Sequence, residues 1–502
     1  MSMGQMLVSG IQAVFGGGQF FMVVLAIVLG TVFGALPGVS ATMAVALGLT
    51  FTYTMEPIAA IVFLVAIYCS SITGGSITAI LFKIPGVPSS APTTFDGYPM
   101  AQRGEAGKAL GVALFTSAIG GLIAAIVMFL LSQPLSKAAL AFGQGDMFAI
   151  TFLGLSILTV LDMDNILTTI ISGLLGLFLA CIGTDPMAGV TRLTFGVRQL
   201  MSGIEMIPVL IGLFAVTEVL KQTNKNKKID VDKNMQNAKV DTKMPTFKEM
   251  WEIKWVMLRC SIVGTVVGIL PGAGATIASF MCYTMENKLS KYPEKFGTGI
   301  IDGIAASETA NNAATGGAMV PLLTLGIPGG NAAAVMVSAL ALKGVQMGPL
   351  LLKNQPEYLS ATFVTMIITN ILMVIVAIGI AKVFAKILSI PYSFLGPIIL
   401  CLALIGSYSE GGSAGVVIMC IAGVFGIIVK SMHLNSAAIV LGLVLGGMCE
   451  GFFSRAYLMN KANVFKVLFG TPIAAVVMTA CILMLLSPLY LPLIKKLTGK
   501  KN

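Results

Sequence analysis

The chain has 502 residues, of which 56% are hydrophobic and 10% charged, and its formal net charge is +10. An ordinary soluble domain carries about 25% charged residues. The composition therefore excludes an ordinary soluble domain and predicts an integral membrane protein. Its eight cysteines are scattered singly through apolar runs, which indicates packing residues rather than a disulfide framework or a metal site.

Apolar runs follow one another along the chain, and each is long enough, or nearly so, to cross about 30 Å of hydrocarbon. They lie at 19–36, 57–82, 109–131, 147–161, 165–183, 203–219, 255–270, 357–388, 394–408, 414–430, 436–449 and 473–494. We therefore predict an all-α polytopic membrane protein with about 10–12 transmembrane helices, accompanied by shorter broken pieces.

The positive charge is concentrated in two segments. Residues 221–259 hold ten Lys or Arg and five Asp or Glu, and the C-terminal tail adds Lys495, Lys496, Lys500 and Lys501. The positive-inside rule places both segments in the cytoplasm. The net charge therefore reports membrane topology, and we do not expect the protein to bind nucleic acid.

The polar linker divides the chain into a first membrane repeat at 1–220, a basic cytoplasmic linker at 221–254 and a second membrane repeat at 255–502. Three motifs recur in the same order in both halves. They are Pro37-Gly38 and Pro271-Gly272, Thr73-Gly74-Gly75 and Thr315-Gly316-Gly317, and Ile84-Pro85-Gly86 and Ile327-Pro328-Gly329. We expect two structural repeats in inverted orientation, each with broken or re-entrant hairpins.

Each Pro-Gly break leaves backbone N–H and C=O groups without helical partners. Irregular backbone at membrane depth is tolerated only against protein, water or a ligand. The four breaks, two in each half, therefore predict a buried polar site between the halves. Helix N-termini at such a site suit a carboxylate, whereas helix C-termini and unwound carbonyls suit a cation.

Small, hydroxyl and amide residues lie at and around the breaks and can donate hydrogen bonds to a carboxylate. The predicted substrate-binding residues are Gly38, Ser40, Thr42, Gly75, Ser76, Gly272, Thr276, Gly329, Gly330 and Asn331. Neutral oxygen and amide groups also ligate hard cations. The predicted sodium site consists of Ser71, Thr73, Asn311, Asn312 and Thr315.

Each hydroxyl in these sets has an alternative role in packing, since Ser and Thr are common where membrane helices approach closely. The pair Asn311 and Asn312 differs, because two adjacent amides cannot both face lipid cheaply. Glu308 lies three residues before this pair. Both a functional role and a structural ion pair are open for it.

No Walker A loop, H-E-x-x-H motif or G-x-S-x-G motif occurs, and the single histidine is His433. We therefore do not expect an enzyme or a bound cofactor, and any active transport must draw on an ion gradient or on another subunit. A passive anion channel is the alternative to a transporter. Its flux would not require a sodium gradient.

Long strings of the sequence resemble the TctA family, the large integral membrane subunit of the tripartite tricarboxylate transporters. They are GALPGVSATMAVALGLTFTYTMEP (34–57), GGSITAILFKIPGVPSSAPTTFDGYPMAQRGEAGKALGVA (74–113), GTDPMAGVTRLTFG (183–196), ILPGAGATIASFMCY (269–283), ASETANNAATGGAMVPLLTLGIPGG (306–330) and LGLVLGGMCEGFFSRAY (441–457). The segment IGSYSEGGSAGVV (405–417) departs from the family's usual asparagines and aspartate, and we assign it no role.

The resemblance implies a secondary active transporter subunit that imports citrate-like tricarboxylates together with a cation, for which we expect sodium. It also implies two partners, a small four-span membrane subunit and a periplasmic solute-binding protein that delivers the substrate. The expected location is the bacterial inner membrane, in contact with lipid, with the linker and C-terminus in the cytoplasm. Dicarboxylates or aromatic acids are alternative substrates, and alternating access is expected through an elevator or rocking movement.

Overall fold

The structure is a computed structural model of the full chain. It describes the backbone of residues 3–36, 39–161, 166–185, 187, 189–223, 244–270, 274–345, 347–387 and 392–497. The predicted site residues Gly38 and Gly272 lie outside these ranges. So do residues 224–243 of the predicted linker, and the division into 1–220, 221–254 and 255–502 stays a prediction.

Helices make up almost all of the described chain, which confirms the all-α prediction. The first half contains α1 (Met3–Phe15), α2 (Gln19–Ala35), α3 (Ala41–Thr52), α4 (Pro57–Phe82), α5 (Thr93–Gln102), α6 (Ala106–Ala139), α7 (Gln144–Leu161), α8 (Ile166–Ala180), α9 (Met206–Ile211) and α10 (Thr217–Thr223). Its short elements are η1 (Gly16–Gly18), η2 (Pro88–Ser90), η3 (Arg198–Ser202), η4 (Gly212–Val216) and the antiparallel two-residue strands β1 (Gly183–Thr184) and β2 (Thr191–Arg192).

The second half begins with a short helix next to the linker. It contains α11 (Phe247–Glu252), α12 (Lys254–Ile269), α13 (Gly274–Leu289), η5 (Pro293–Lys295), α14 (Ile301–Leu325), α15 (Asn331–Leu342), α16 (Leu351–Asn354), α17 (Pro356–Ile387), α18 (Tyr392–Ser431), α19 (Ser436–Met459), α20 (Val464–Phe469) and α21 (Pro472–Leu497). Proline opens α4, α17 and α21, where its missing N–H costs no helical hydrogen bond.

Six helical segments of the described chain are long and apolar enough to cross a membrane, which confirms a multi-pass membrane protein. They are Gly4–Ala35, Pro57–Phe82, Ala106–Ala139, Pro356–Ala381, Gly411–Ser431 and Ala438–Met459. Shorter apolar helices include Ala41–Thr52 and Asn331–Leu342, which follow two of the proline-glycine breaks. The breaks thus explain why several apolar runs form helices too short to span alone.

The same order of elements occurs in both halves, and the same contacts recur. Both α4 and α14 end at a residue in left-handed conformation, Lys83 with φ 57° and Gly326 with φ 74°, directly before Ile-Pro-Gly. A Cβ placed on Gly86 would stand 2.1 Å from the carbonyl oxygen of Gly34 on α2. A Cβ on Gly329 would stand 2.7 Å from that of Gly268 on α12. The internal repeat therefore extends to packing, while its inverted orientation stays a prediction.

Helices α4 and α14 form the centre of the molecule. Every residue from Ala60 to Leu81 and from Gly303 to Thr324 is buried. Helix α4 packs on α2 of its own half and on α17 of the other, and α14 packs on α12 of its own half and on α6 of the other. The two halves therefore share one core instead of folding as separate domains.

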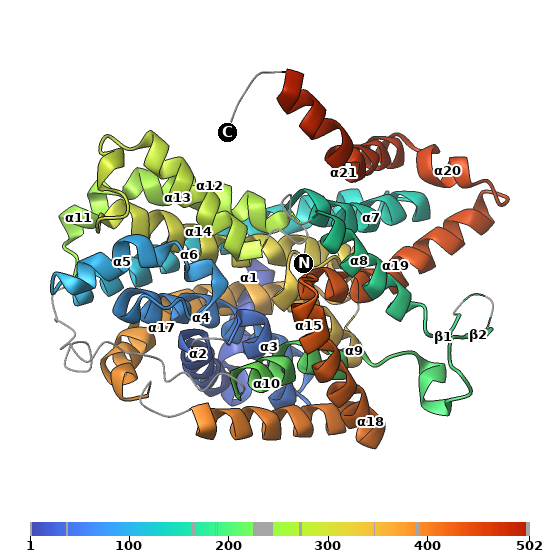
Figure 1. Ribbon diagram of the computed structural model, residues 1–502, viewed down its shortest axis with the longest axis horizontal. Coiled ribbons are helices and arrows are strands. Elements are labelled where there is room, and N and C mark those ends of the chain that lie inside the picture. The colour runs from blue at the N-terminus through green and yellow to red at the C-terminus, as the bar shows by residue number, and fades with distance from the viewer. Residues whose placement is uncertain are drawn as a thin grey trace.

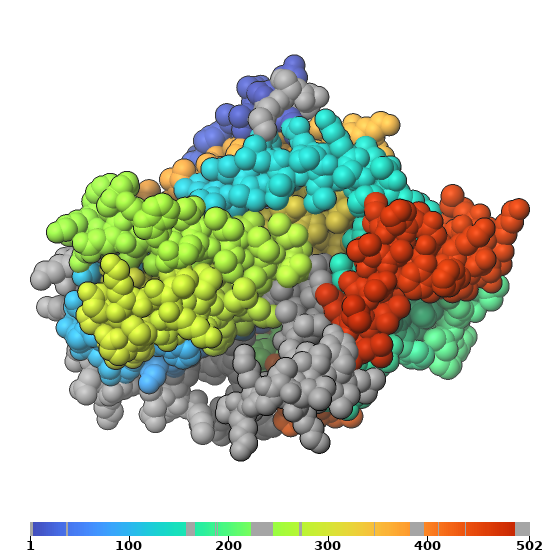
Figure 2. All heavy atoms as spheres, turned by 90° about the horizontal axis from the view of Figure 1, so that it is seen from above, coloured from blue at the N-terminus to red at the C-terminus, as the bar shows by residue number. Residues whose placement is uncertain are grey.

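The remaining helices cover this core. Figure 1 shows α11, α12 and α13 at one end, with α20, α21 and the β1–β2 hairpin at the other. Helix α19 packs on α7 and α8, and α21 packs on α7. In Figure 2 the yellow-green atoms of α12 and α13 and the red atoms of the C-terminal helices again lie at opposite ends. Helix α18 is kinked at Gly411 and Gly412 and packs on α9 and η4.

Candidate functional site

A cavity of about 600 Å³ lies where the breaks of the two halves meet, and we call it the break cavity. Its lining residues come from four broken segments and from helices beside them. They are Ser40, Ala41, Thr42, Met43, Tyr68, Ile72, Pro85, Gly86, Val87, Pro88, Ser89, Phe214, Glu218, Gly274, Ala275, Thr276, Ile277, Gly330, Asn331, Ala332 and Lys430. The structure thus brings both halves together around one cavity.

Three helices of at least twelve residues begin at the wall of this cavity. Helix α3 begins at Ala41, α13 at Gly274 and α15 at Asn331. The side chain of Ser40 caps α3 by accepting a hydrogen bond from the N–H of Met43 at 3.1 Å. Gly330 precedes α15 and gives it no side-chain cap. Free N–H groups and positive dipole ends therefore face the space in which an anion can bind.

The predicted substrate-binding residues fall into three groups. Ser40, Thr42, Thr276, Gly330 and Asn331 line the cavity. Gly75, Ser76 and Gly329 lie in the packed backbone behind it, and Gly38 and Gly272 lie outside the described residues. Gly75 lies next to the cavity wall, because its carbonyl oxygen accepts a hydrogen bond of 3.2 Å from the N–H of Gly86, a lining residue.

One ion pair stands in the cavity wall. Lys430 at the end of α18 lies 2.7 Å from Glu218 on α10, measured from Nζ to Oε2. Among the lining residues these two are the charged ones. A cation that already holds a carboxylate at the wall can exchange it for a carboxylate of a ligand.

The predicted sodium-binding residues do not line the cavity. Thr73, Asn311, Asn312 and Thr315 lie at the buried crossing of α4 and α14. Thr73 donates to Asn312 Oδ1 at 2.8 Å, Asn312 Nδ2 donates to Asn311 Oδ1 at 2.7 Å, and Thr315 donates to the carbonyl of Asn312 at 2.7 Å. Ser71 stands apart and donates to the carbonyl of Tyr68 at 2.9 Å.

Glu308 extends this crossing into what we call the glutamate cluster, formed by Glu308, Thr93, Ser117, Asn311 and Asn312. Glu308 Oε2 accepts hydrogen bonds from the Ser117 hydroxyl at 3.1 Å and from Asn311 Nδ2 at 3.2 Å, and Thr93 donates to Oε1. The contacts described for this carboxyl group are all with neutral groups. The sequence left a functional role and a structural ion pair open for Glu308, and the described contacts contain no ion pair.

Several lining residues were not foreseen from the sequence. Ser89 could have been found, because the Pro-Ser-Ser of η2 follows the first Ile-Pro-Gly break directly. Glu218 and Lys430 carried no such signal, because each stands at the end of an apolar run and they are separated by 212 positions. Only the packing of α10 against α18 brings them together.

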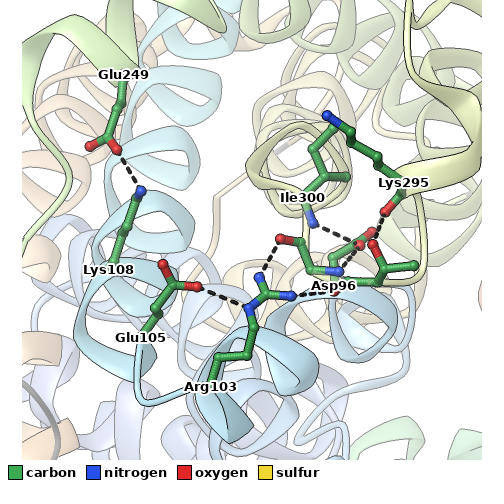
Figure 3. A network of polar contacts seen from close by, with 9 residues as sticks. Asp96, Arg103, Glu105, Lys108, Glu249, Lys295 and Ile300 are labelled. Carbon is green, nitrogen blue, oxygen red and sulfur yellow. Dashed lines mark hydrogen bonds and ion pairs between the residues drawn. The ribbon is translucent and has the colours of Figure 1, made fainter.

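A polar network around α5 joins the first half to the second (Figure 3). Asp96 Oδ1 accepts the backbone N–H groups of Gly299 at 2.8 Å and Ile300 at 3.0 Å. Arg103 donates to the carbonyl of Gly299 at 2.7 Å and pairs with Glu105. Helix α5 and the start of α14 are therefore fixed to one another, which positions the segment between Gly86 and α5.

A multi-pass helical protein with two similar halves around a polar cavity, bounded by broken helices, has the architecture of a membrane transport protein. The model of the tripartite tricarboxylate transporter TctA family matches residues 20–441. The chain therefore belongs to the TctA family, which makes it a subunit of a tricarboxylate transporter.

Two proteins of Agrobacterium vitis are similar to this chain. One, described as an uncharacterized 52.8 kDa protein in the TAR-I ttuC' 3'region, is 36% identical over 466 residues, which cover 92% of each chain. Another, described as an uncharacterized protein in the TAR-II ttuC' 3'region, is 36% identical over 229 residues, which cover 45% of this chain and 94% of that protein. No solved structure gives a significant match.

Proposed function

We propose that the break cavity is the carboxylate-binding site of a secondary active transporter subunit that imports citrate-like anions. The observation that carries this proposal is the convergence of the N-termini of α3, α13 and α15 on one cavity. Oriented N–H groups offset the cost of burying a carboxylate without placing a permanent charge in the membrane. Apart from the Glu218–Lys430 pair the lining is neutral, which lets the anion leave as well as bind.

Lys430 supplies a second anchor in this proposal. A substrate with two or three carboxylates places one against the helix N-termini and another against Lys430, which exchanges Glu218 for it. A charge-assisted hydrogen bond of this kind is about twice as strong as a neutral one. The wall therefore favours dicarboxylates and tricarboxylates over monocarboxylates, including aromatic monoacids.

The transport cycle that we propose is alternating access, by an elevator or rocking movement of the hairpin-bearing unit, driven by a cation gradient. Sodium is the cation expected from the sequence. A periplasmic solute-binding protein delivers the substrate, and a small four-span subunit completes the complex. We place the chain in the bacterial inner membrane with the linker and C-terminus in the cytoplasm, which agrees with their lysine content.

Counterflow in proteoliposomes that contain the chain with its two proposed partner proteins tests the cavity. Asn331→Ala at the start of α15 removes a polar side chain from the cavity wall and should raise the KM for citrate about tenfold, the loss of one hydrogen bond to a charged group. The matched control is Asn463→Ala, which removes the N-cap of α20, a helix that does not line the cavity. An equal KM for citrate in Asn331→Ala and wild type would show that the cavity is not the binding site.

The same vesicles separate a transporter from a passive channel. A transporter shows saturable counterflow, in which unlabelled citrate inside drives labelled citrate inward. A channel shows flux that follows the citrate gradient alone and shows no such exchange. Exchange without saturation, or flux without exchange, would contradict alternating access.

A further inference from the structure

Glu308 is a buried carboxyl group that the proposed carboxylate site does not use. Its side chain is 0% exposed in the middle of α14, and its two oxygens contact hydroxyl and amide groups. Burying a carboxylate without a cation is costly, so such groups are paired, neutralised or functional. The question is which cation neutralises Glu308.

Several titratable groups on the helices around α14 have other partners, line the cavity or are exposed. Asp96 of α5 accepts hydrogen bonds from backbone N–H groups and from the hydroxyl of Tyr283 of α13. Arg259 of α12 pairs with Glu286 of α13, and Lys108 of α6 pairs with Glu249. Cys69 of α4 contacts Thr315, Tyr68 of α4 lines the break cavity, and Lys353 of α16 is exposed. No side-chain cation of the described chain is recorded in contact with Glu308. Among the described residues this leaves a cation from solution to neutralise Glu308.

The amide groups of the cluster leave little room for a metal ion. Asn312 Nδ2 donates to the carbonyl of Glu308 at 3.2 Å, and this contact fixes the orientation of the Asn312 amide. Asn312 Nδ2 also donates to Asn311 Oδ1, so Asn311 must turn its own Nδ2 toward Glu308 Oε2. N–H and O–H groups therefore occupy the positions around Oε2 in which a metal ion needs oxygen ligands at about 2.0–2.6 Å.

A proton needs no such cage, and the hydroxyl groups can satisfy both protonation states. Thr93 contacts Glu308 Oε1 and lies 3.0 Å from Ser307 Oγ, and Ser307 can donate to the carbonyl of Gly303 at 3.0 Å. With a charged Glu308, Thr93 donates to the carboxylate. With a protonated Glu308, the acid donates to Thr93, Thr93 to Ser307 and Ser307 to Gly303. Rotation of two hydroxyl groups accommodates the added proton.

The segment from Pro88 to Thr93 connects the glutamate cluster with the break cavity. Ser89 lines the cavity, and its carbonyl oxygen lies 3.5 Å from Asn311 Nδ2, which contacts Glu308. The hydroxyl of Ser89 is buried and has no hydrogen-bond partner among the described residues. Thr93, at the other end of the segment, contacts Glu308 directly. A ligand that shifts Ser89 therefore also shifts the hydrogen bonds of Glu308.

We propose that Glu308 is a proton-binding site that is loaded and unloaded once in each transport cycle. The proton passes from water in the break cavity to a carboxylate oxygen of Glu308 when the anion binds. The proton returns to water on the other side of the membrane when the segment from Pro88 to Thr93 moves away and water reaches the carboxylate. This inference rests on the proposed function for the cycle, and it assigns a proton in place of sodium to this cluster.

Infrared difference spectroscopy of the full chain in lipid tests the proton site without any transport. With citrate bound at neutral pH, wild type should show the C=O stretch of a protonated carboxylic acid that Glu308→Gln lacks. Glu286→Gln is the matched control, because the Glu286 carboxylate is nearly as buried but already pairs with Arg259 at 2.6 Å. A spectrum of Glu308→Gln identical to that of wild type overturns the proposal.

Uptake into proteoliposomes that contain the chain with its two proposed partner proteins tests the coupling. An inward proton gradient at equal sodium should drive citrate accumulation in wild type and in Glu286→Gln, whereas Glu308→Gln should keep counterflow and lose accumulation. Glu308→Asp keeps the titratable group and should restore accumulation in part, which also covers the case of a poorly folded glutamine variant. Accumulation driven by sodium alone at equal pH, or normal accumulation in Glu308→Gln, contradicts the proposal. Absence of counterflow in wild type contradicts the proposed function instead. The infrared spectrum then still decides whether Glu308 binds a proton.

Discussion

Thr73 on α4 donates a hydrogen bond of 2.8 Å to the side-chain oxygen of Asn312 on α14, 239 positions later in the chain. Both side chains are fully buried at the centre of the molecule. This bond joins the first half to the second at the point where the two central helices cross. Its loss leaves an amide oxygen without its hydroxyl donor in a region that water does not reach.

Replacing Thr73 by valine should therefore lower stability. The shape of the side chain is kept, but Asn312 Oδ1 loses its donor, which costs about 1–3 kcal/mol. Thermal unfolding in detergent should show a lower apparent Tm. Thr309→Val on α14 is the control, because the buried hydroxyl of Thr309 has no hydrogen-bond partner in the described chain. Equal Tm values for the two variants would show that the bond contributes nothing.

The residues that line the break cavity could be predicted from the sequence more readily than the contacts of the glutamate cluster. The breaks were visible because proline and glycine act on their own backbone, and Ser40, Thr42, Thr276 and Asn331 follow from them. The glutamate cluster depends on which side chains meet across helices. Asn311 and Asn312 stood out, but Thr93 and Ser117, the partners of the neighbouring Glu308, lie about 200 positions away, and no local pattern relates them.

The repeat was also detectable in the sequence, but its consequences for packing were not. The order of motifs predicted two similar halves, and the contacts of Gly86 and Gly329 with Gly34 and Gly268 agree with this. That α6 covers α14 while α17 covers α4 could not be predicted, because helices with nearly uniform apolar surfaces do not specify their neighbours.

Glycine at the close approach of α2 and α4 gives a second prediction. A Cβ added at Gly34 would stand 1.9 Å from the carbonyl oxygen of Ser71, so Gly34→Ala must push the two helices apart and should destabilise the protein by about 1–3 kcal/mol. Gly379→Ala on α17 is the matched control, since its Cβ would meet nothing within 4 Å. Alanine there should be neutral or stabilising by up to about 1 kcal/mol.

The apparent Tm of both glycine variants decides this prediction. A Gly34→Ala protein as stable as wild type would mean that α2 and α4 are not in close contact. Gly268→Ala on α12 should behave like Gly34→Ala, because its Cβ would stand 2.4 Å from the carbonyl of Ala314 on α14. A large difference between the two would count against equivalent packing of the halves.

Lys430 and Glu218 give a prediction about substrate choice. Lys430→Gln should raise the KM for citrate and succinate about tenfold and leave that of a monocarboxylate nearly unchanged, because only the second carboxylate loses its partner. Glu218→Gln should act in the opposite direction, because it frees Lys430 from its 2.7 Å ion pair and removes a negative charge from the wall. Counterflow with a series of acids measures both effects.

Lys343→Gln is the control for this charge. Lys343 donates to the carbonyls of Tyr53 at 2.7 Å and Met55 at 3.0 Å, beyond the end of α3, and it does not line the cavity. Its loss can reduce the amount of folded protein without changing the order of preference among acids. An equal loss for monocarboxylates and dicarboxylates in Lys430→Gln would refute the second anchor.

Glu249, beside the linker, gives a prediction about pH. Its carboxylate accepts the backbone N–H of Thr246 at 2.8 Å at the start of α11 and pairs with Lys108 at the start of α6 (Figure 3). The Lys108 ammonium and the capping hydrogen bonds lower the pKa of Glu249 from 4.5 to about 2. Because the charged form is favoured in the folded state, the stabilisation is complete above pH 4.5 and disappears as the pH falls toward 2.

Glu249→Gln should therefore loosen the attachment of α11 to α6 at neutral pH by about 1 kcal/mol, the value of a helix cap with a partly exposed ion pair. Hydrogen exchange of residues 246–252 measures this attachment locally. The difference from wild type should shrink below pH 4.5, where the unfolded segment takes up a proton before the folded one does. Glu252→Gln, an exposed position on the same helix, should show a smaller effect. A Glu249→Gln effect that stays constant down to the most acidic pH would mean that charge does not hold α11 in place.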